Sequence, residues 1–280
     1  SVTSGFPIII VVPGMCLMDM WYLESSSIIP TIALRDGDYS DSIDVAKRIS
    51  LALEMPFEGG VKNIAKRDGL GIVLLEAVST MGRLPDHYFQ AVGSGTGAIG
   101  VWEMAERFLR DGRFGSRSPV LHLAQNLPFA PMVNAWKRGS RELAPEDLRA
   151  ELIGEITTRV LSNRYPAYST RGGVYDALTA TCGETYGITN EEAYASMDVF
   201  EKAEGIDIVP AAGVAVAALK RAVDTGKVDH RDTILLNITG GGEKRLEREK
   251  KTYEVKPFFI SKHISEKEME VFLCNTLKKS

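Results

Sequence analysis

The chain has 280 residues and a net charge of -4 at pH 7, with 44% hydrophobic and 25% charged residues. This is the composition of a globular protein with a substantial core, and the slightly acidic charge gives no reason to expect nucleic acid as a partner. Because no run of about 18 apolar residues occurs, we expect no membrane-spanning helix.

Apolar runs alternate with helical patterns along the chain, which predicts an α/β fold of open, mostly parallel sheets with helices on both faces. The expected strands are Pro7–Val12, Thr31–Leu34, Tyr88–Val92, Val120–Ala124 and Thr233–Ile238. The expected helices are Asp41–Glu54, Lys66–Thr80, Ala98–Asp111, Ala130–Arg138, Pro145–Leu161, Val174–Thr181, Glu191–Glu204 and Pro210–Thr225.

A change of character near Pro56–Gly60 divides the chain into two expected domains. Residues 1–57 form part of a small α/β domain, and residues 58–280 form a large domain that carries most of the strands and helices. The highly charged stretch Glu243–Glu254 is expected to be a solvated face or loop.

A glycine-rich turn joins the strand Tyr88–Val92 to the following helix. Glycines in Gly93-Ser94-Gly95-Thr96-Gly97 allow an anion to approach the backbone closely, the first amides of the helix point toward it, and Ser94 and Thr96 add hydroxyl donors. The alternative is a tight strand-to-helix turn without a ligand. The turn therefore predicts a phosphate site.

The kind of phosphate compound can be narrowed from the surrounding residues. The pattern Gly95-x-Gly97-x-x-Gly100 formally matches a dinucleotide fingerprint, but the next strand ends in Gln125 and Asn126, without the carboxylate that would bind a ribose. The Gly-Lys-Ser/Thr of a P-loop is also missing. These observations disfavour a nucleotide, and with it an oxidoreductase, and leave a small phosphorylated cofactor.

A second glycine cluster follows the strand Thr233–Ile238, where Thr239 precedes three glycines. Ligands bind at the carboxyl ends of strands in open parallel sheets, so both clusters could line one crevice. There the Thr239 hydroxyl could hydrogen-bond a flat aromatic nitrogen. The alternative is a strand-terminating turn, because glycine clusters mark loops by default.

The two clusters together resemble the tryptophan-synthase-β-like pyridoxal-phosphate enzymes of fold type II. Within them the sequence is most similar to the cysteate synthases, relatives of threonine synthase in coenzyme M biosynthesis of methanogens. Further segments that carry the resemblance are Glu58–Gly69, Gln125–Met132, Arg171–Leu178 and Glu204–Asp207. The resemblance implies that pyridoxal 5'-phosphate is the cofactor. Its phosphate would be bound by Gly93, Ser94, Gly95, Thr96 and Gly97, and its pyridine nitrogen would face Thr239.

The resemblance also implies a reaction. It would be a β-replacement that converts O-phospho-L-serine and sulfite to L-cysteate and phosphate, catalysed by a transferase that is a homo-oligomer. Both substrates are anions, so we expect basic residues in irregular or glycine-rich segments to bind them. The candidates are Lys62, Arg164 and Arg171, followed by Lys66 and Arg67. The alternative for each is an ordinary surface charge.

The sequence departs from the family in one respect. The Schiff-base lysine of the family lies upstream of the strand that corresponds to Pro7–Val12, so we expect no catalytic residue within this chain and no activity from this chain alone. Two alternatives stay open. One is a threonine synthase that acts on O-phosphohomoserine, and the other is a non-catalytic truncated fragment of such an enzyme.

Cysteine and histidine offer no competing chemistry. The chain has 3 cysteines and 4 histidines, all widely separated and without the spacing of metal or redox motifs. We therefore expect no metal site and no disulfide framework, and a location in the reducing cytoplasm.

Overall fold

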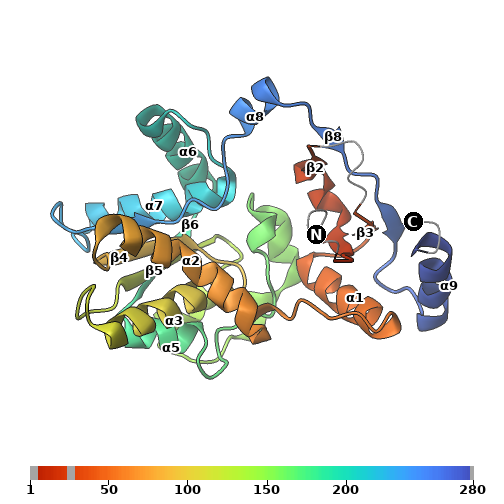
Figure 1. Cartoon of the computed structure of the whole chain (residues 1–280), viewed down its shortest axis with the longest axis horizontal. Helices are drawn as coiled ribbons and strands as arrows, with labels where there is room; N and C mark the ends of the chain where they lie inside the picture. The colour runs from red at the N-terminus through yellow and green to blue at the C-terminus, as the bar shows by residue number, and fades with distance from the viewer. Residues whose placement is uncertain (1–5, 24–28, 278–280) are drawn as a thin grey trace. The chain divides into compact units, whose positions relative to one another are not determined.

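The computed structural model describes residues 6–23 and 29–277. The chain divides into two compact units, one made of Ser1–Glu58 with Lys244–Ser280 and the other of Gly59–Glu243 (Figure 1). The C-terminal residues therefore group with the first unit, whereas the sequence placed them in the second. The physical reason is strand pairing, because β9 (Phe258–Ile260) joins the parallel sheet of the first unit beside β3 (Thr31–Leu34).

The second unit is built on one parallel sheet. Within its described residues, Gly59–Glu243, the strand order is β6-β5-β4-β7, and every neighbouring pair is parallel. The strands are β4 (His87–Ala91), β5 (Val120–Asn126), β6 (Glu184–Ile188) and β7 (Ile234–Leu236). The sheet confirms the predicted α/β architecture. Strand β6 was not predicted, because its sequence Glu-Thr-Tyr-Gly-Ile lacks an apolar run.

Helices cover both faces of this sheet, as predicted. On one face Tyr88 of β4 packs against α2, α3 and α5, and on the other face Phe89 packs against α6 and α7 (Figure 1). Neighbouring residues of a strand point to opposite faces, so consecutive aromatic residues serve the two cores. The helices of this unit are α2 (Ile64–Met81), α3 (Thr96–Asp111), α4 (Pro131–Lys137), α5 (Val174–Ala180), α6 (Asn190–Glu204) and α7 (Pro210–Asp224).

Local sequence sets where several helices begin. Thr189 and Glu192 form a capping box at the start of α6, in which each side chain accepts a hydrogen bond from the backbone amide of the other. Pro210 occupies the first turn of α7, where backbone amides make no hydrogen bond within the helix, so the missing amide hydrogen of proline is tolerated.

The predicted helix Pro145–Leu161 is wrong. This segment forms three short 3-10 turns, Pro145–Leu148, Ala150–Glu155 and Arg159–Leu161. Asn126 Oδ1 accepts hydrogen bonds from the backbone amide and hydroxyl of Thr158, at 3.2 and 3.0 Å. The Thr158 amide is therefore bonded outside any helix, and Ile153 and Ile156 of this segment pack with Phe129 in a small core.

The first unit contains a parallel sheet in the order β1-β3-β9, with β1 at Ile10–Pro13. Helix α1 (Tyr39–Ala52) starts with a capping box between Asp38 and Asp41. The remaining elements are the antiparallel pair β2 (Trp21–Tyr22) and β8 (Tyr253–Glu254), the 3-10 turn Gly14–Asp19, the short helix α8 (Glu243–Glu249) and α9 (Glu266–Leu277). Among the residues with described coordinates, no helix has the length and apolar character needed to cross a bilayer.

Candidate functional site

The predicted phosphate loop connects β4 to the start of α3. Gly95 is the N-cap of α3 with φ of 80° and, being glycine, has no side chain to accept from the helix amides. The Thr96 amide donates to Ser94 Oγ at 3.3 Å, and the first turn of the 16-residue helix carries the positive end of the helix dipole. The Ser94 and Thr96 hydroxyls lie 3.0 Å apart beside these amides. This set of donors fits a phosphate group.

One neighbouring segment fixes the shape of the loop. A Cβ added at Gly93 would lie 3.1 Å from Leu161 Cα, and one at Gly95 would lie 2.2 Å from Val174 Cγ2. Between these two contacts, the Ala167 amide donates to the Ser94 carbonyl at 2.9 Å. The segment from Leu161 to Val174 therefore packs directly on the loop, and side chains at the two glycines would separate them.

Thr239 follows the strand next to the loop. Strands β4 and β7 are parallel with Phe89 opposite Leu236, and the Asn237 amide donates to the Phe89 carbonyl at 2.9 Å. The glycine loop and Thr239 thus leave the carboxyl ends of adjacent parallel strands. Thr239 is exposed. The structure brings the two predicted clusters to the same edge of the sheet.

A partly buried series of hydrogen bonds that the sequence did not reveal links the strands that lead to the two clusters. Asn237 Nδ2 donates to the Tyr88 hydroxyl at 2.9 Å, and this hydroxyl donates to Gln90 Oε1 at 3.1 Å. The Gln90 amide packs under the loop, since a Cβ at Gly97 would lie 2.5 Å from its Nε2. Tyr88 is fully buried, and burial raises the pKa of its hydroxyl, so it stays neutral.

The predicted basic residues at α2 differ in their surroundings. Arg67 forms an ion pair within the protein, because its Nε lies 3.0 Å from both carboxylate oxygens of Glu103. Its carbonyl oxygen would lie 2.5 Å from a Cβ at Gly100, so the first turn of α2 packs on the second turn of α3. Lys62 ends the 3-10 turn Gly60–Lys62 just before α2 and is exposed, while Lys66 is half-buried.

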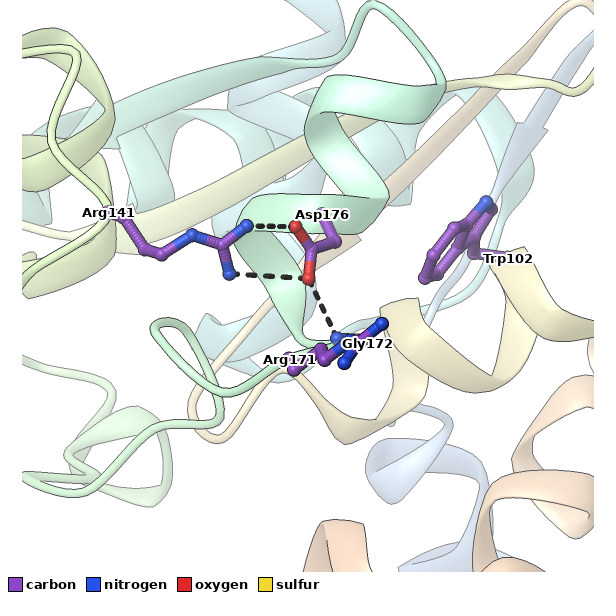
Figure 2. A pocket seen from close by; sticks show the side chains of 5 residues that line it. All are labelled: Trp102, Arg141, Arg171, Gly172 and Asp176. Carbon is purple, nitrogen blue, oxygen red and sulfur yellow. Dashed lines mark hydrogen bonds and ion pairs between the residues drawn. The ribbon is translucent and has the colours of Figure 1, made fainter.

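The two predicted arginines lie in different surroundings. Arg164 belongs to the segment that packs on the glycine loop, with its guanidinium 5.5 Å from the ring centre of Tyr165. Arg171 instead lines a pocket of about 690 Å³ whose lining includes none of the loop residues (Figure 2). The other residues around this pocket are Trp102, Arg141, Gly172 and Asp176.

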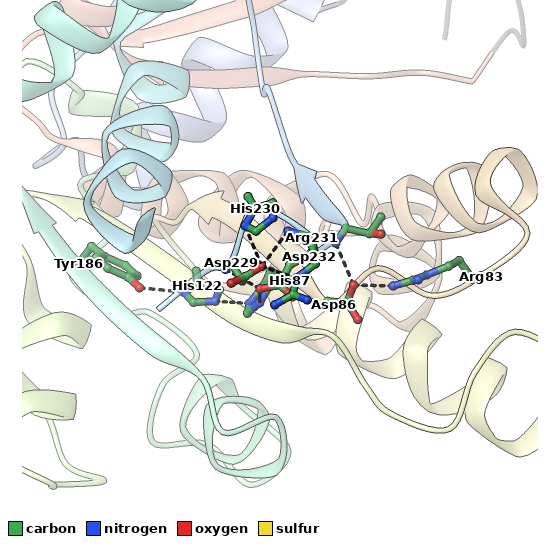
Figure 3. Close-up of polar contacts among 10 residues, drawn as sticks. Arg83, Asp86, His87, His122, Tyr186, Asp229, His230, Arg231 and Asp232 are labelled. Atoms are coloured by element: carbon green, nitrogen blue, oxygen red, sulfur yellow. Dashed lines mark hydrogen bonds and ion pairs between the residues drawn. The ribbon is translucent and has the colours of Figure 1, made fainter. Parts of the chain in front are cut away.

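A second polar cluster lies at the opposite end of the sheet, where β4 begins (Figure 3). His87 Nε2 lies 3.1 Å from Asp232 Oδ2, and His87 Nδ1 lies 2.9 Å from His122 Nε2. His122 Nδ1 in turn lies 2.8 Å from the Tyr186 hydroxyl. Burial, with the nearby charges of His87 and Lys227, lowers the pKa of His122 to about 3. His122 is therefore neutral at physiological pH. Within residues 6–23 and 29–277, no group of three or more acidic, histidine or cysteine side chains is placed so that it could hold a metal ion.

The family model described as pyridoxal-phosphate dependent enzyme matches residues 4–240, a range that includes both glycine clusters. The chain belongs to this family. Pyridoxal phosphate is the cofactor of the family, as the sequence predicted. A solved structure of serine racemase from Dictyostelium discoideum aligns with a TM-score of 0.51 at 14% identity, over 76% of this chain and 68% of that chain. This likeness concerns the fold alone and agrees with the predicted fold type II architecture.

Curated relatives are much more similar in sequence. The chain is 51% identical to the cysteate synthase of Methanocella paludicola, 50% to that of Methanocella arvoryzae and 48% to that of Methanosarcina barkeri. These matches cover 92%, 92% and 94% of this chain, and 61%, 63% and 64% of the relatives. The chain therefore spans a little over three fifths of the length of the curated relatives it matches.

Proposed function

We propose that the protein is a cysteate synthase, which replaces the phosphate of O-phospho-L-serine with sulfite to give L-cysteate and phosphate. The observation that carries this proposal is the meeting of two glycine clusters at one sheet edge, in a chain about half identical to cysteate synthases. Either feature alone would leave the reaction open, since the fold serves many activities.

The glycine loop is the proposed phosphate site of the cofactor. Gly93, Ser94, Gly95, Thr96 and Gly97 would bind the phosphate through backbone amides and two hydroxyls, and Thr239 would meet the pyridine nitrogen from the neighbouring strand. When bound, the cofactor supplies the electron sink that makes loss of the substrate's α-proton possible. A threonine hydroxyl, unlike a carboxylate, does not hold that nitrogen in its protonated form.

Two of the predicted basic residues are the proposed substrate ligands. Lys62 is exposed beside the start of α2, and Arg164 lies in the segment that packs on the loop. A guanidinium can bind two oxygens of a phosphate or sulfite at once, whereas an ammonium acts as a point charge. We assign Arg164 and Lys62 to binding of the two substrate anions, while Arg171 lines a pocket of its own.

The reaction itself is the test. Protein expressed from the complete gene is incubated with O-phospho-L-serine, with and without sulfite, and the products are measured by mass spectrometry and phosphate release. We expect L-cysteate only when sulfite is present. Formation of L-threonine from O-phosphohomoserine, without any sulfite-dependent product, would instead identify a threonine synthase. Failure to release phosphate from either substrate would contradict the proposed chemistry as a whole.

A further inference from the structure

The pocket around Arg171 is lined by none of the glycine-loop residues, and the proposed reaction assigns it no role. It is formed by Trp102 of α3, by Arg141 after α4, and by the turn that leads into α5 (Figure 2). It is a depression that is wide open to solvent, with a volume of about 690 Å³.

The frame of the pocket is held by a dense set of polar contacts. The Arg141 guanidinium forms an ion pair with Asp176 and also donates to the Ser169 carbonyl at 3.4 Å. The Gly172 amide donates to Asp176 Oδ2 at 2.7 Å, and the Ser169 hydroxyl donates to the Arg141 carbonyl at 2.8 Å. Arg141 also lies 4.5 Å from the ring centre of Tyr175. The turn that carries Arg171 is therefore fixed before any ligand arrives.

The charged groups around the pocket are two guanidinium groups, Arg141 and Arg171, and one carboxylate, Asp176. Asp176 is matched by Arg141, which lowers the pKa of the Asp176 carboxyl and keeps it ionised. Arg171 is exposed and its charge acts on the Asp176 carboxylate, but it has no hydrogen bond or ion pair within the described residues. Its side chain extends toward Trp102 (Figure 2). The pocket thus combines one available guanidinium with an indole ring.

We propose that this pocket binds a small aromatic anion, with an acidic group on Arg171 and a planar ring against Trp102. A guanidinium in a fixed fork binds two oxygens of a carboxylate or phosphate. An indole face offers a large apolar surface for stacking, and a volume of this size exceeds what a bare inorganic anion would fill. The site is separate from the glycine loop, so the proposal does not rest on the proposed reaction.

Phenyl phosphate is a suitable probe, and Trp102 is the reporter. The Trp102 Nε1 atom is buried and has no hydrogen-bond partner among the described residues, which favours slow exchange of its proton with water. In a tryptophan-labelled ¹H–¹⁵N spectrum, this signal is identified by its loss in Trp102→Phe. We expect phenyl phosphate to shift it in a saturable way, and inorganic phosphate to bind at least tenfold more weakly.

Charge-matched variants separate this site from the glycine loop. We expect Arg171→Gln to weaken phenyl phosphate binding at least tenfold, and Arg117→Gln to leave it unchanged, since Arg117 is exposed and does not line the pocket. Ser94→Ala should also leave the titration of Trp102 unchanged, even if it impairs cofactor binding. A Trp102 signal that does not move, or equal weakening by the two arginine variants, would overturn the proposal.

Discussion

Gly95 combines two constraints in one residue. Its φ of 80° is a conformation that L side chains rarely adopt, and an added Cβ would lie 2.2 Å from Val174 Cγ2. We expect Gly95→Ala to destabilise the protein by about 3 kcal/mol, from backbone strain and overpacking together. Gly205→Ala is the control, because Gly205 has a φ of 72° with nothing within 4 Å. Gly205→Ala should lower the free energy of unfolding, measured with urea, by only about 1 kcal/mol. Equal losses for the two variants would refute the packing role of Gly95.

The Tyr88 hydroxyl provides a second prediction. Tyr88→Phe removes the acceptor of Asn237 and the donor to Gln90, and leaves two inward-facing polar groups without their partner. We expect a loss of about 2 kcal/mol in the free energy of unfolding. Tyr194→Phe removes a hydroxyl whose hydrogen bond, to Thr157, is exposed to solvent, and should stay within about 0.5 kcal/mol of the unchanged protein. A loss no larger than this for Tyr88→Phe would show that the hydrogen bonds of Tyr88 contribute little to the stability of the protein.

At the scale of elements, the hydrogen-bond chain across β4, β5 and β6 makes stability depend on pH. His122 has a folded-state pKa of about 3, far below its unfolded value, so the unfolded chain takes up a proton first as pH falls. Stability from this group is complete above pH 6.5 or so and is lost toward pH 3. When the pH falls from 7 to 5, we expect protonation of this group in the unfolded chain to lower the free energy of unfolding by about 2 kcal/mol.

Urea unfolding at the two pH values, compared between variants, measures this contribution. His122→Gln should reduce the pH dependence of the free energy of unfolding by that amount. His230→Gln is the control for replacing a histidine at an exposed position, where the ring contacts the exposed Asp229 at 3.2 Å. An unaltered pH dependence in His122→Gln would mean that His122 is protonated in the folded protein.

The elements differ in how far the sequence predicted them. Helices α6 and α7 were found because their start residues and their apolar pattern are local features. The helix predicted at Pro145–Leu161 failed because Asn126, far away in sequence, takes the amide of Thr158. In the site, the glycine loop is a local motif and was predicted. The Tyr88–Asn237 contact joins residues 149 apart, and no local pattern reports such a pair.

At the scale of the whole molecule, the C-terminal segment is part of the first unit. Leu273 of α9 is only 3% exposed and packs in one core with Ile32 and Leu34 of β3. We expect Leu273→Ala to cost about 3 kcal/mol in that unit. Hydrogen exchange should show faster exchange at β3 and unchanged exchange at β4. Val271→Ala, an exposed neighbour on α9, is the control and should have little effect.

The most direct test of the account is whether Ser94 and Thr239 act on different parts of one cofactor. Equilibrium binding of pyridoxal phosphate and of inorganic phosphate is measured for Ser94→Ala and Thr239→Val in protein from the complete gene. We predict that Ser94→Ala weakens both ligands, whereas Thr239→Val weakens pyridoxal phosphate about fivefold, the worth of one hydrogen bond, and leaves inorganic phosphate unchanged. Unaltered binding of pyridoxal phosphate in both variants would contradict the account.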